Sequence, residues 1–216
     1  MKQGRNTGGR GGVILYESGE LFLKKNIIVL GPSRAGKTTL TKKLNEALNY
    51  SVVCFDSIIY AFEQAFPQLE ICHGAGAQNT AANLAGFLFH YFCMLSYRSE
   101  HKNGVKFVAE GGYFDFEKIM LALSHDERIN DFLFIGLVYN NKTPGALFDD
   151  IRKNDAEGDW SYNCDDDTLR KCVHIFIEDS RQLHKKFQKH NFMIYDVSSD
   201  REQVLDKIVN DIKGIT

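Results

Sequence analysis

Residues 26–48 constrain the fold of this chain more than any other stretch. They read NIIVLGPSRAGKTTLTKKLNEAL, in which a short apolar run ends at a glycine and an amphipathic helical pattern follows. Between the two, residues 31–38 fit the pattern G-x-x-x-x-G-K-[ST]. The backbone N–H groups of such a loop point inward at an anion, and the helix adds the positive end of its dipole. The stretch therefore predicts a strand, a phosphate-binding loop and a helix, and the alternative is a glycine-rich turn whose serine caps the helix.

The residues of this loop have separate expected roles. Lys37 reaches the β- and γ-phosphates of a bound nucleotide as a point charge, and the hydroxyl of Thr38 is a ligand for Mg²⁺. Arg34 either contacts phosphate or points into solvent, and Thr39 either lies near the α-phosphate or bonds back within the helix. The predicted nucleotide-binding residues are Gly31, Ser33, Arg34, Ala35, Gly36, Lys37, Thr38 and Thr39.

Charge and cysteine content narrow the class of protein. The formal net charge is −2 and the isoelectric point is near 6.4, which gives no electrostatic case for nucleic acid or an anionic membrane as a partner. The five cysteines include no C-x-x-C pair, so we expect no zinc or disulfide framework and a reducing, cytoplasmic location. No apolar segment follows the charged N-terminus, and the apolar-rich stretch at 84–97 is too short to span a bilayer.

Short apolar runs alternate with helical patterns from residue 26 onward. The expected strands cover residues 27–30, 50–55, 105–109, 132–139 and 192–197. The expected helices cover residues 36–48, 57–66, 80–97, 116–123, 165–189 and 201–212. This alternation predicts an α/β fold with a five-stranded parallel sheet and helices on both faces. We expect one domain at 26–216, preceded at 1–25 by a flexible glycine-rich arm and a short hairpin.

The polar residues that follow these strands should meet at one edge of the sheet. Right-handed crossovers put the carboxyl ends of all parallel strands on the same edge, where open α/β sheets bind ligands. The loop at 31–38, Asp56, Glu110 and the polar segment at 140–164 each follow a strand. We therefore expect them to line one crevice.

The loop sequence GPSRAGKTT at residues 31–39 resembles the P-loop of the adenylate-kinase-like superfamily, which includes nucleoside monophosphate kinases and related small-molecule kinases. It is similar to GPSGAGKST of guanylate kinases, with Arg34 in the place of a glycine. The layout of residues 26–213 is also similar, with a polar lid at 140–164. The resemblance implies a P-loop nucleoside triphosphate hydrolase fold. The substrate motifs of guanylate kinases and adenylate kinases are absent, which leaves the acceptor open.

The resemblance also implies roles for two carboxylates. Asp56 would accept the proton of the acceptor hydroxyl or hold a magnesium-bound water, and the alternative is that it only caps the helix that follows. Glu110 occupies the Walker-B position, where it would bind magnesium with Thr38 or act as a base, and the alternative is a solvated turn. Gly111 and Gly112 would leave room for the substrate.

In such kinases a basic residue of the lid clamps the transferred phosphoryl group. Arg152 is the arginine within residues 140–164 and is the predicted clamp, with Lys142 and Lys153 as weaker candidates. Ser198 and Ser199 resemble the loop beside adenine in these kinases.

The acceptor would bind within residues 57–100, which are rich in aromatic side chains. His73 and His90 are candidates there by position, and each has a structural role as its alternative. Gln78 and Asn79 are candidates for reading a polar acceptor.

The resemblance implies an ATP- and Mg²⁺-dependent small-molecule kinase, with ATP and a small-molecule acceptor as its partners and its oligomeric state left open. The predicted catalytic residues are Lys37, Asp56, Glu110 and Arg152. The first alternative is a nucleotide-binding regulator, or an ATPase that acts on a partner. The second is a GTPase-like switch, because Asn141 and Lys142 begin a pattern similar to N-K-x-D, although Pro144 stands in the place of the aspartate.

Overall fold

The computed structural model describes residues 25–74, 79–100 and 105–215. The arm and hairpin predicted within 1–25 lie outside these residues, apart from Lys25, and so does Gln78. Five parallel strands form one sheet in the order β2-β3-β1-β4-β5. They are β1 (Asn26–Leu30), β2 (Ser51–Cys54), β3 (Phe107–Gly111), β4 (Phe132–Val138) and β5 (Met193–Asp196). The predicted α/β fold with a five-stranded parallel sheet is confirmed.

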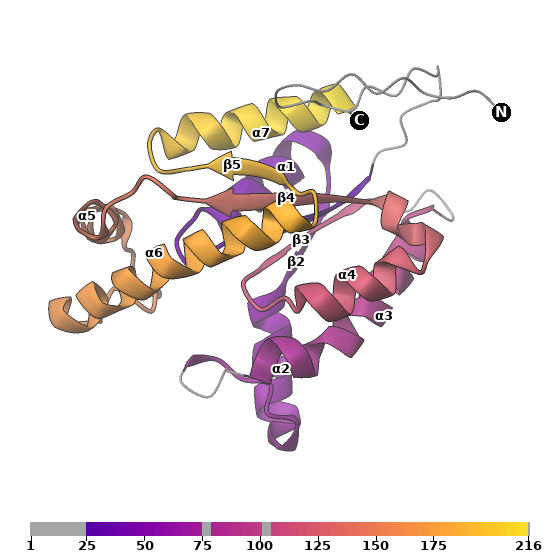
Figure 1. The fold of residues 1–216 in the computed structure, drawn as a ribbon, viewed down its shortest axis with the longest axis horizontal. Coiled ribbons are helices and arrows are strands. Elements are labelled where there is room, and N and C mark those ends of the chain that lie inside the picture. The colour runs from indigo at the N-terminus through magenta and orange to yellow at the C-terminus, as the bar shows by residue number, and fades with distance from the viewer. Residues whose placement is uncertain (1–24, 75–78, 101–104, 216) are drawn as a thin grey trace.

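The helices connect these strands in the expected order (Figure 1). They are α1 (Lys37–Leu48), α2 (Phe55–Ala65), α3 (Thr80–Glu100), α4 (Phe116–Ser124), α5 (Pro144–Asn154), α6 (Asp166–Lys189) and α7 (Arg201–Ile215). The short 3₁₀ helices η1 (Pro67–Leu69) and η3 (Glu127–Asp131) lie between them. None of the helices within the described ranges is long and apolar enough to cross a membrane.

Alternation along the central strand β1 separates the core into two parts. Ile27 and Val29 face one side of the sheet, and Ile28 and Leu30 face the other, as the two-residue period of a strand requires. The first pair packs with buried residues of α1, α5, α7 and the first half of α6, among them Leu40, Leu44, Leu147, Val173, Leu205 and Ile208. The second pair packs with α2, α3, α4 and the end of α6, among them Ile59, Leu84, Phe92, Ile119 and Phe187.

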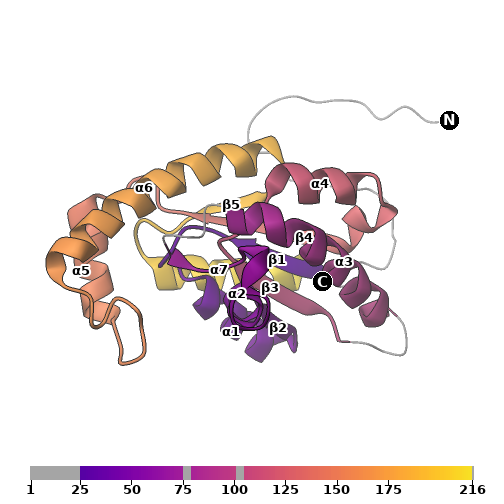
Figure 2. The same cartoon turned by 90° about the horizontal axis from the view of Figure 1, so that it is seen from below.

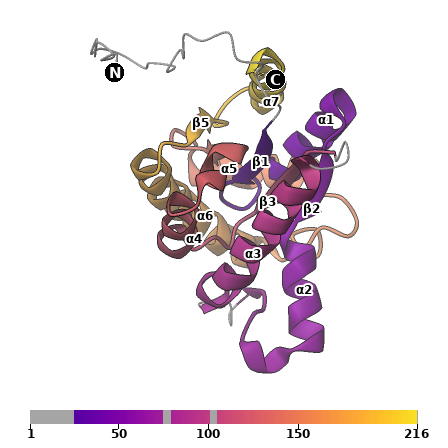
Figure 3. The same cartoon turned by 90° about the vertical axis from the view of Figure 1, so that its right-hand side faces the viewer.

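The figures show how these layers are arranged. Figure 3 shows α1 and α7 on one side of the sheet and α3 and α4 on the other, with α2 projecting from the sheet. Figure 2 shows α5 and the beginning of α6 side by side at one end of the molecule. The sheet is therefore covered on both faces, and α2 and α5 extend from it in different directions.

Helix α5 was not predicted, because residues 140–164 were interpreted only as a polar lid. The Thr143 side chain caps the helix by accepting a hydrogen bond from Ala146 N at 3.2 Å, and Pro144 occupies the first turn. Leu147 and Ile151 lie one turn apart and are both buried. The lid segment is therefore anchored to the core by a helix rather than attached only at its ends.

The beginning of α2 was also predicted incorrectly. The expected strand at 50–55 ends at Cys54, and the helix begins at Phe55 instead of Ser57. Phe55 is fully buried in the α3/α4 side of the core. The helix begins at Phe55 because its first turn directs this ring inward against the sheet, where the ring is buried.

Candidate active site

The loop between β1 and α1 has the backbone conformation of a phosphate cradle. Arg34 has φ of 65° and Gly36 has φ of 93°, both in the left-handed region. Gly36 adopts this region without steric cost, whereas at Arg34 a side chain occupies a conformation that favours glycine. The Lys37 ammonium folds back over the loop and donates to Pro32 O at 2.9 Å. The backbone is therefore wrapped around the position where an anion would lie.

Lys37 lies among acidic groups from two other elements. Burial lowers the pKa of Lys37 below its ordinary value, and the nearby charges of Glu110 and Asp56 partly oppose this shift. Glu110 belongs to β3, and Asp56 lies in the first turn of α2. The structure therefore brings together three of the four predicted catalytic residues.

Thr38 and Glu110 are directly bonded. The Thr38 hydroxyl donates to Glu110 Oε1 at 3.1 Å, and Glu110 is only 4% exposed. The parallel register pairs Glu110 with Val29 of β1 and with Cys54 of β2, which holds its side chain at the carboxyl edge beside the loop. A hydroxyl and a buried carboxylate are hard oxygen donors suited to Mg²⁺, which usually keeps water and phosphate oxygens as its other ligands.

Among the described residues there is no group of three or more His, Cys, Asp or Glu that would hold a metal ion by itself. A magnesium ion bound by Thr38 and Glu110 would need further ligands from a nucleotide and from water. The residues present fit a metal that arrives with its nucleotide.

One alternative for Asp56 was that it only caps the helix that follows. This alternative is wrong, because the N-cap position of α2 is Cys54. The Asp56 side chain is 64% exposed, and Oδ1 lies 3.8 Å from Nε2 of His73. The other ring nitrogen of His73 lies 3.3 Å from Glu63 Oε2, and the ring contacts Tyr113 edge-on at 6.0 Å between centroids. Asp56 lies near enough to Lys37 for its charge to act on it, and His73 connects Asp56 to Glu63 and Tyr113.

His73 was a candidate by position alone, and Glu63 and Tyr113 carry no signal in the sequence that would make them candidates. Glu63 comes from the last turns of α2, His73 follows η1, and Tyr113 follows β3. No local spacing signals a cluster that three separate segments build. The predicted substrate space at Gly111 is instead occupied by Phe55, since a Cβ on Gly111 would lie 2.2 Å from a carbon of that ring.

Arg34 connects the loop to the lid segment. Its guanidinium bonds to Asp155 and Ser161, and Nη1 lies 3.1 Å from Asp159 Oδ2. The Asp155 side chain is 5% exposed and Ser161 is fully buried. Arg34 therefore does not extend into solvent, which was one of its two alternatives. Its Nε is buried and has no hydrogen-bond partner in the part of the chain that the structure describes.

Arg152, the predicted clamp, lies at the end of α5 and is bonded to the lid segment and to the first residue of α6. Its Nη2 donates to Asp166 Oδ1 and to Cys164 O, both at 2.6 Å, and Nη1 donates to Ser161 O at 2.8 Å. Lys142, a weaker candidate, is paired with Asp150. The structure does not bring either side chain to Lys37.

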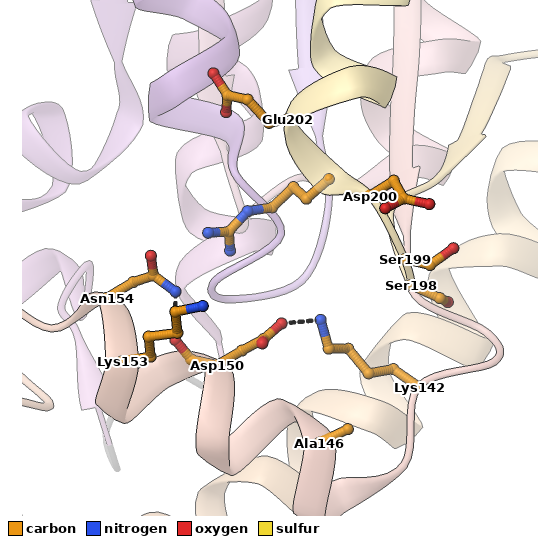
Figure 4. A pocket seen from close by; sticks show the side chains of 10 residues that line it. Lys142, Ala146, Asp150, Lys153, Asn154, Ser198, Ser199, Asp200 and Glu202 are labelled. Carbon is orange, nitrogen blue, oxygen red and sulfur yellow. Dashed lines mark hydrogen bonds and ion pairs between the residues drawn. The ribbon is translucent and has the colours of Figure 1, made fainter.

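A cavity of about 430 Å³ lies between α5 and the segment that joins β5 to α7, next to the phosphate loop (Figure 4). Its lining is polar and comprises Lys142, Ala146, Asp150, Lys153, Asn154, Ser198, Ser199, Asp200, Arg201 and Glu202. Arg201 links it to the loop by donating to Arg34 O at 3.5 Å. Ser198 and Ser199, predicted to lie beside a base, therefore line a cavity next to the phosphate cradle.

No protein-family model matches the sequence, and a search of curated proteins gives no match. Solved structures do match. A gluconokinase from Sinorhizobium meliloti 1021 aligns with a TM-score of 0.51 and 12% identity over 89% of this chain and 93% of its own. The shikimate kinase from Acinetobacter baumannii in complex with shikimate aligns with a TM-score of 0.51 and 18% identity over 89% and 94%. The chain therefore shares the fold of these two kinases, and the fold that the resemblance in the loop implied is confirmed.

Proposed function

We propose that this protein is an ATP- and Mg²⁺-dependent kinase that transfers the γ-phosphoryl group to a small molecule. The observation that carries this proposal is the Thr38–Glu110 hydrogen bond of 3.1 Å beside Lys37. This bond joins a loop hydroxyl to a buried strand-end carboxylate, and the charge of that carboxylate also acts on the Lys37 ammonium. Phosphoryl transfer needs this combination, because its catalysis is mostly positioning and neutralisation of charge.

The nucleotide would bind with its phosphates in the loop and its base in the adjoining cavity. The N–H groups of residues 31–39 would hold the phosphates, with the Lys37 ammonium released from Pro32 O to reach the β- and γ-phosphates. The unpartnered Nε of Arg34 is a further donor at this place. The cavity volume of about 430 Å³ is within the range of ordinary ligand sites.

Thr38 and Glu110 would hold Mg²⁺, which neutralises the charge of the β- and γ-phosphate oxygens when bound. Asp56, exposed and close to Lys37, would take the proton of the attacking hydroxyl. The bond from the acceptor oxygen to the γ-phosphorus forms while the bond from that phosphorus to the β–γ bridging oxygen breaks. Lys37 stabilises the negative charge that moves onto the leaving oxygen.

Arg152 would serve as the clamp only after lid closure breaks its bonds to Asp166 and Cys164 O. Helix α5 carries Arg152, so a movement of this helix is what the proposal requires. The five cysteines include no C-x-x-C pair, which supports the reducing cytoplasm that we propose as the location.

The test is ATP consumption with Mg²⁺ across a panel of nucleosides, nucleotides, sugars and other hydroxylated metabolites. Lys37→Ala should lower acceptor-dependent turnover by about 100-fold or more, because it removes the cation at the transferring phosphoryl group. Lys42→Ala, an exposed position on the same helix, is the matched control and should leave turnover unchanged. Circular dichroism and thermal unfolding would verify that both variants fold.

Full turnover in Lys37→Ala would contradict the proposed function. Binding of ATP without transfer to any compound would favour the alternative, a nucleotide-binding regulator or an ATPase that acts on a partner. Preference for GTP over ATP would favour a GTPase-like switch.

A further inference from the structure

The wall of the site beside α2 contains an unusual distribution of charge. Lys and Arg make up 26 of the 216 residues, yet none occurs between Lys43 and Arg98. This stretch includes α2, η1 and most of α3. Arg98 lies at the opposite edge of the sheet, because the neighbouring Ser99 accepts a hydrogen bond from Asn26 at the start of β1.

Two carboxylates and an imidazole are among the polar groups that this wall presents near the loop. His73 lies between Asp56 at 3.8 Å and Glu63 at 3.3 Å. Both carboxylates are partly exposed, at 64% and 37%. A proton on His73 would supply one positive charge, but both carboxylates already flank that ring. The wall can exchange hydrogen bonds with hydroxyl groups and pair with an ammonium, but it has no cation to offer an anion.

Within residues 25–74, 79–100 and 105–215, three cations of other elements that lie toward this wall or across the site from it already have partners. Lys118 of α4 reaches the beginning of α3 by donating to Ala82 O at 3.3 Å, and it also lies 3.9 Å from the Asp115 carboxylate. On the lid side, Arg34 and Arg152 are both paired with Asp155, and Arg152 is also paired with Asp166 of α6. Lys37 is committed to the transferred phosphoryl group in the proposed function.

We propose that the phosphoryl acceptor is an uncharged or positively charged hydroxyl compound that carries no phosphate or carboxylate group. This inference rests on the proposed kinase function. An acceptor with an anionic group would place that group against Asp56 and Glu63 with no Lys or Arg to pair with it. A sugar, a polyol or an amino alcohol would instead have its polar groups matched by Asp56, His73 and Glu63.

The test uses compounds that share a skeleton and differ in charge. Suitable sets are a hexose with its aldonate and its hexosamine, a nucleoside with its 5′-monophosphate, and shikimate with its methyl ester. Phosphorylated product is measured by mass spectrometry with the full chain, ATP and Mg²⁺. In the set that contains the best acceptor, kcat/KM for the uncharged or cationic member should exceed that for the anionic member by about tenfold or more.

A variant tests the wall directly. Glu63→Lys should raise the ratio of kcat/KM for the anionic member to that for the uncharged member by about fivefold. Glu46→Lys makes the same charge change at an exposed position of α1 and should leave the ratio unchanged. Unfolding temperatures of the two variants verify that the charge change, and not loss of fold, moves the ratio.

The outcomes separate this inference from the function on which it rests. A carboxylate or phosphate compound as the best acceptor would overturn the inference and leave the kinase standing. The same ratio in Glu63→Lys and Glu46→Lys would also overturn the inference. ATP binding with no phosphorylation of any compound would remove the proposed function and the inference with it.

Discussion

Gly111 and Gly112 adjoin each other after Glu110 but have different surroundings. A Cβ on Gly111 would lie 2.2 Å from Phe55 Cδ2, whereas a Cβ on Gly112 would meet nothing within 4 Å. Phe55 can lie against β3 only because Gly111 lacks a side chain, and this contact places the first turn of α2 beside the strand end. Asp56 follows Phe55 in that turn. The glycine therefore sets the position of a proposed catalytic carboxylate.

Gly111→Ala should lower the free energy of unfolding by about 1–3 kcal/mol, because the added methyl group overpacks the core against Phe55. Gly112→Ala is the matched control, with the same substitution one residue later in open space, and we expect a change within about 0.5 kcal/mol. Urea unfolding of both variants measures the difference. Equal stability of the two variants would show that Phe55 moves aside without cost.

The lid segment is an element whose position depends on paired charges. Asp155, directly after α5, accepts hydrogen bonds from Arg34 and from Arg152, and the latter contact is 3.5 Å long. Ser161 donates to the same carboxylate at 2.6 Å. One arginine comes from the phosphate loop and the other from α5, so Asp155 connects the two elements. Opening or closing of the lid must break or rearrange this connection.

Arg34→Ala should release the lid from the loop. Removing one partner of a largely buried ion pair leaves the Asp155 carboxylate with fewer donors, so we expect a loss of about 2 kcal/mol in the free energy of unfolding. Hydrogen exchange should become faster in residues 155–164. Arg181→Ala removes an exposed arginine of α6 that is paired with Glu178 and is the control. Unchanged exchange in the lid of the Arg34 variant would refute the connection.

At the scale of the whole fold, the described residues form two hydrophobic cores, one on each face of the sheet. Ile208 of α7 is fully buried in the α1/α7 core, and Ile119 of α4 is buried in the α3/α4 core. The sheet lies between the two side chains, and they belong to different contact clusters. Substitutions at distant sites without shared partners change stability independently.

Ile119→Val and Ile208→Val should each lower the free energy of unfolding by about 1 kcal/mol. The double variant should lose the sum of the two to within about 0.5 kcal/mol. Denaturant unfolding of the wild-type protein, the two single variants and the double variant completes this double-mutant cycle. A larger coupling would mean that the two faces of the sheet are not independent and that strain passes through the strands.

Much of the fold could be predicted because its signals are local. The order of strands and helices follows from the period of apolar residues, and the phosphate loop follows from the spacing of two glycines, Lys37 and Thr38. Helix α5 was missed although Thr143 and Pro144 carry a local start signal, because the segment was interpreted by its polarity. The start of α2 was misplaced because burial of Phe55 depends on Gly111, a residue far away in the sequence.

The sequence by itself determined the parallel sheet, the loop and the acidic residues at the strand ends, since each depends on neighbours a few residues away. Only the tertiary structure decided which partners these residues have. Arg34 and Asp155 are separated by 121 positions, and Thr38 and Glu110 by 72. Hydrogen bonds and ion pairs act over a few ångströms, so their partners follow from chain topology and packing. The composition of residues 44–97 was readable from the sequence, but its meaning emerged when the fold placed Asp56, His73 and Glu63 beside the loop.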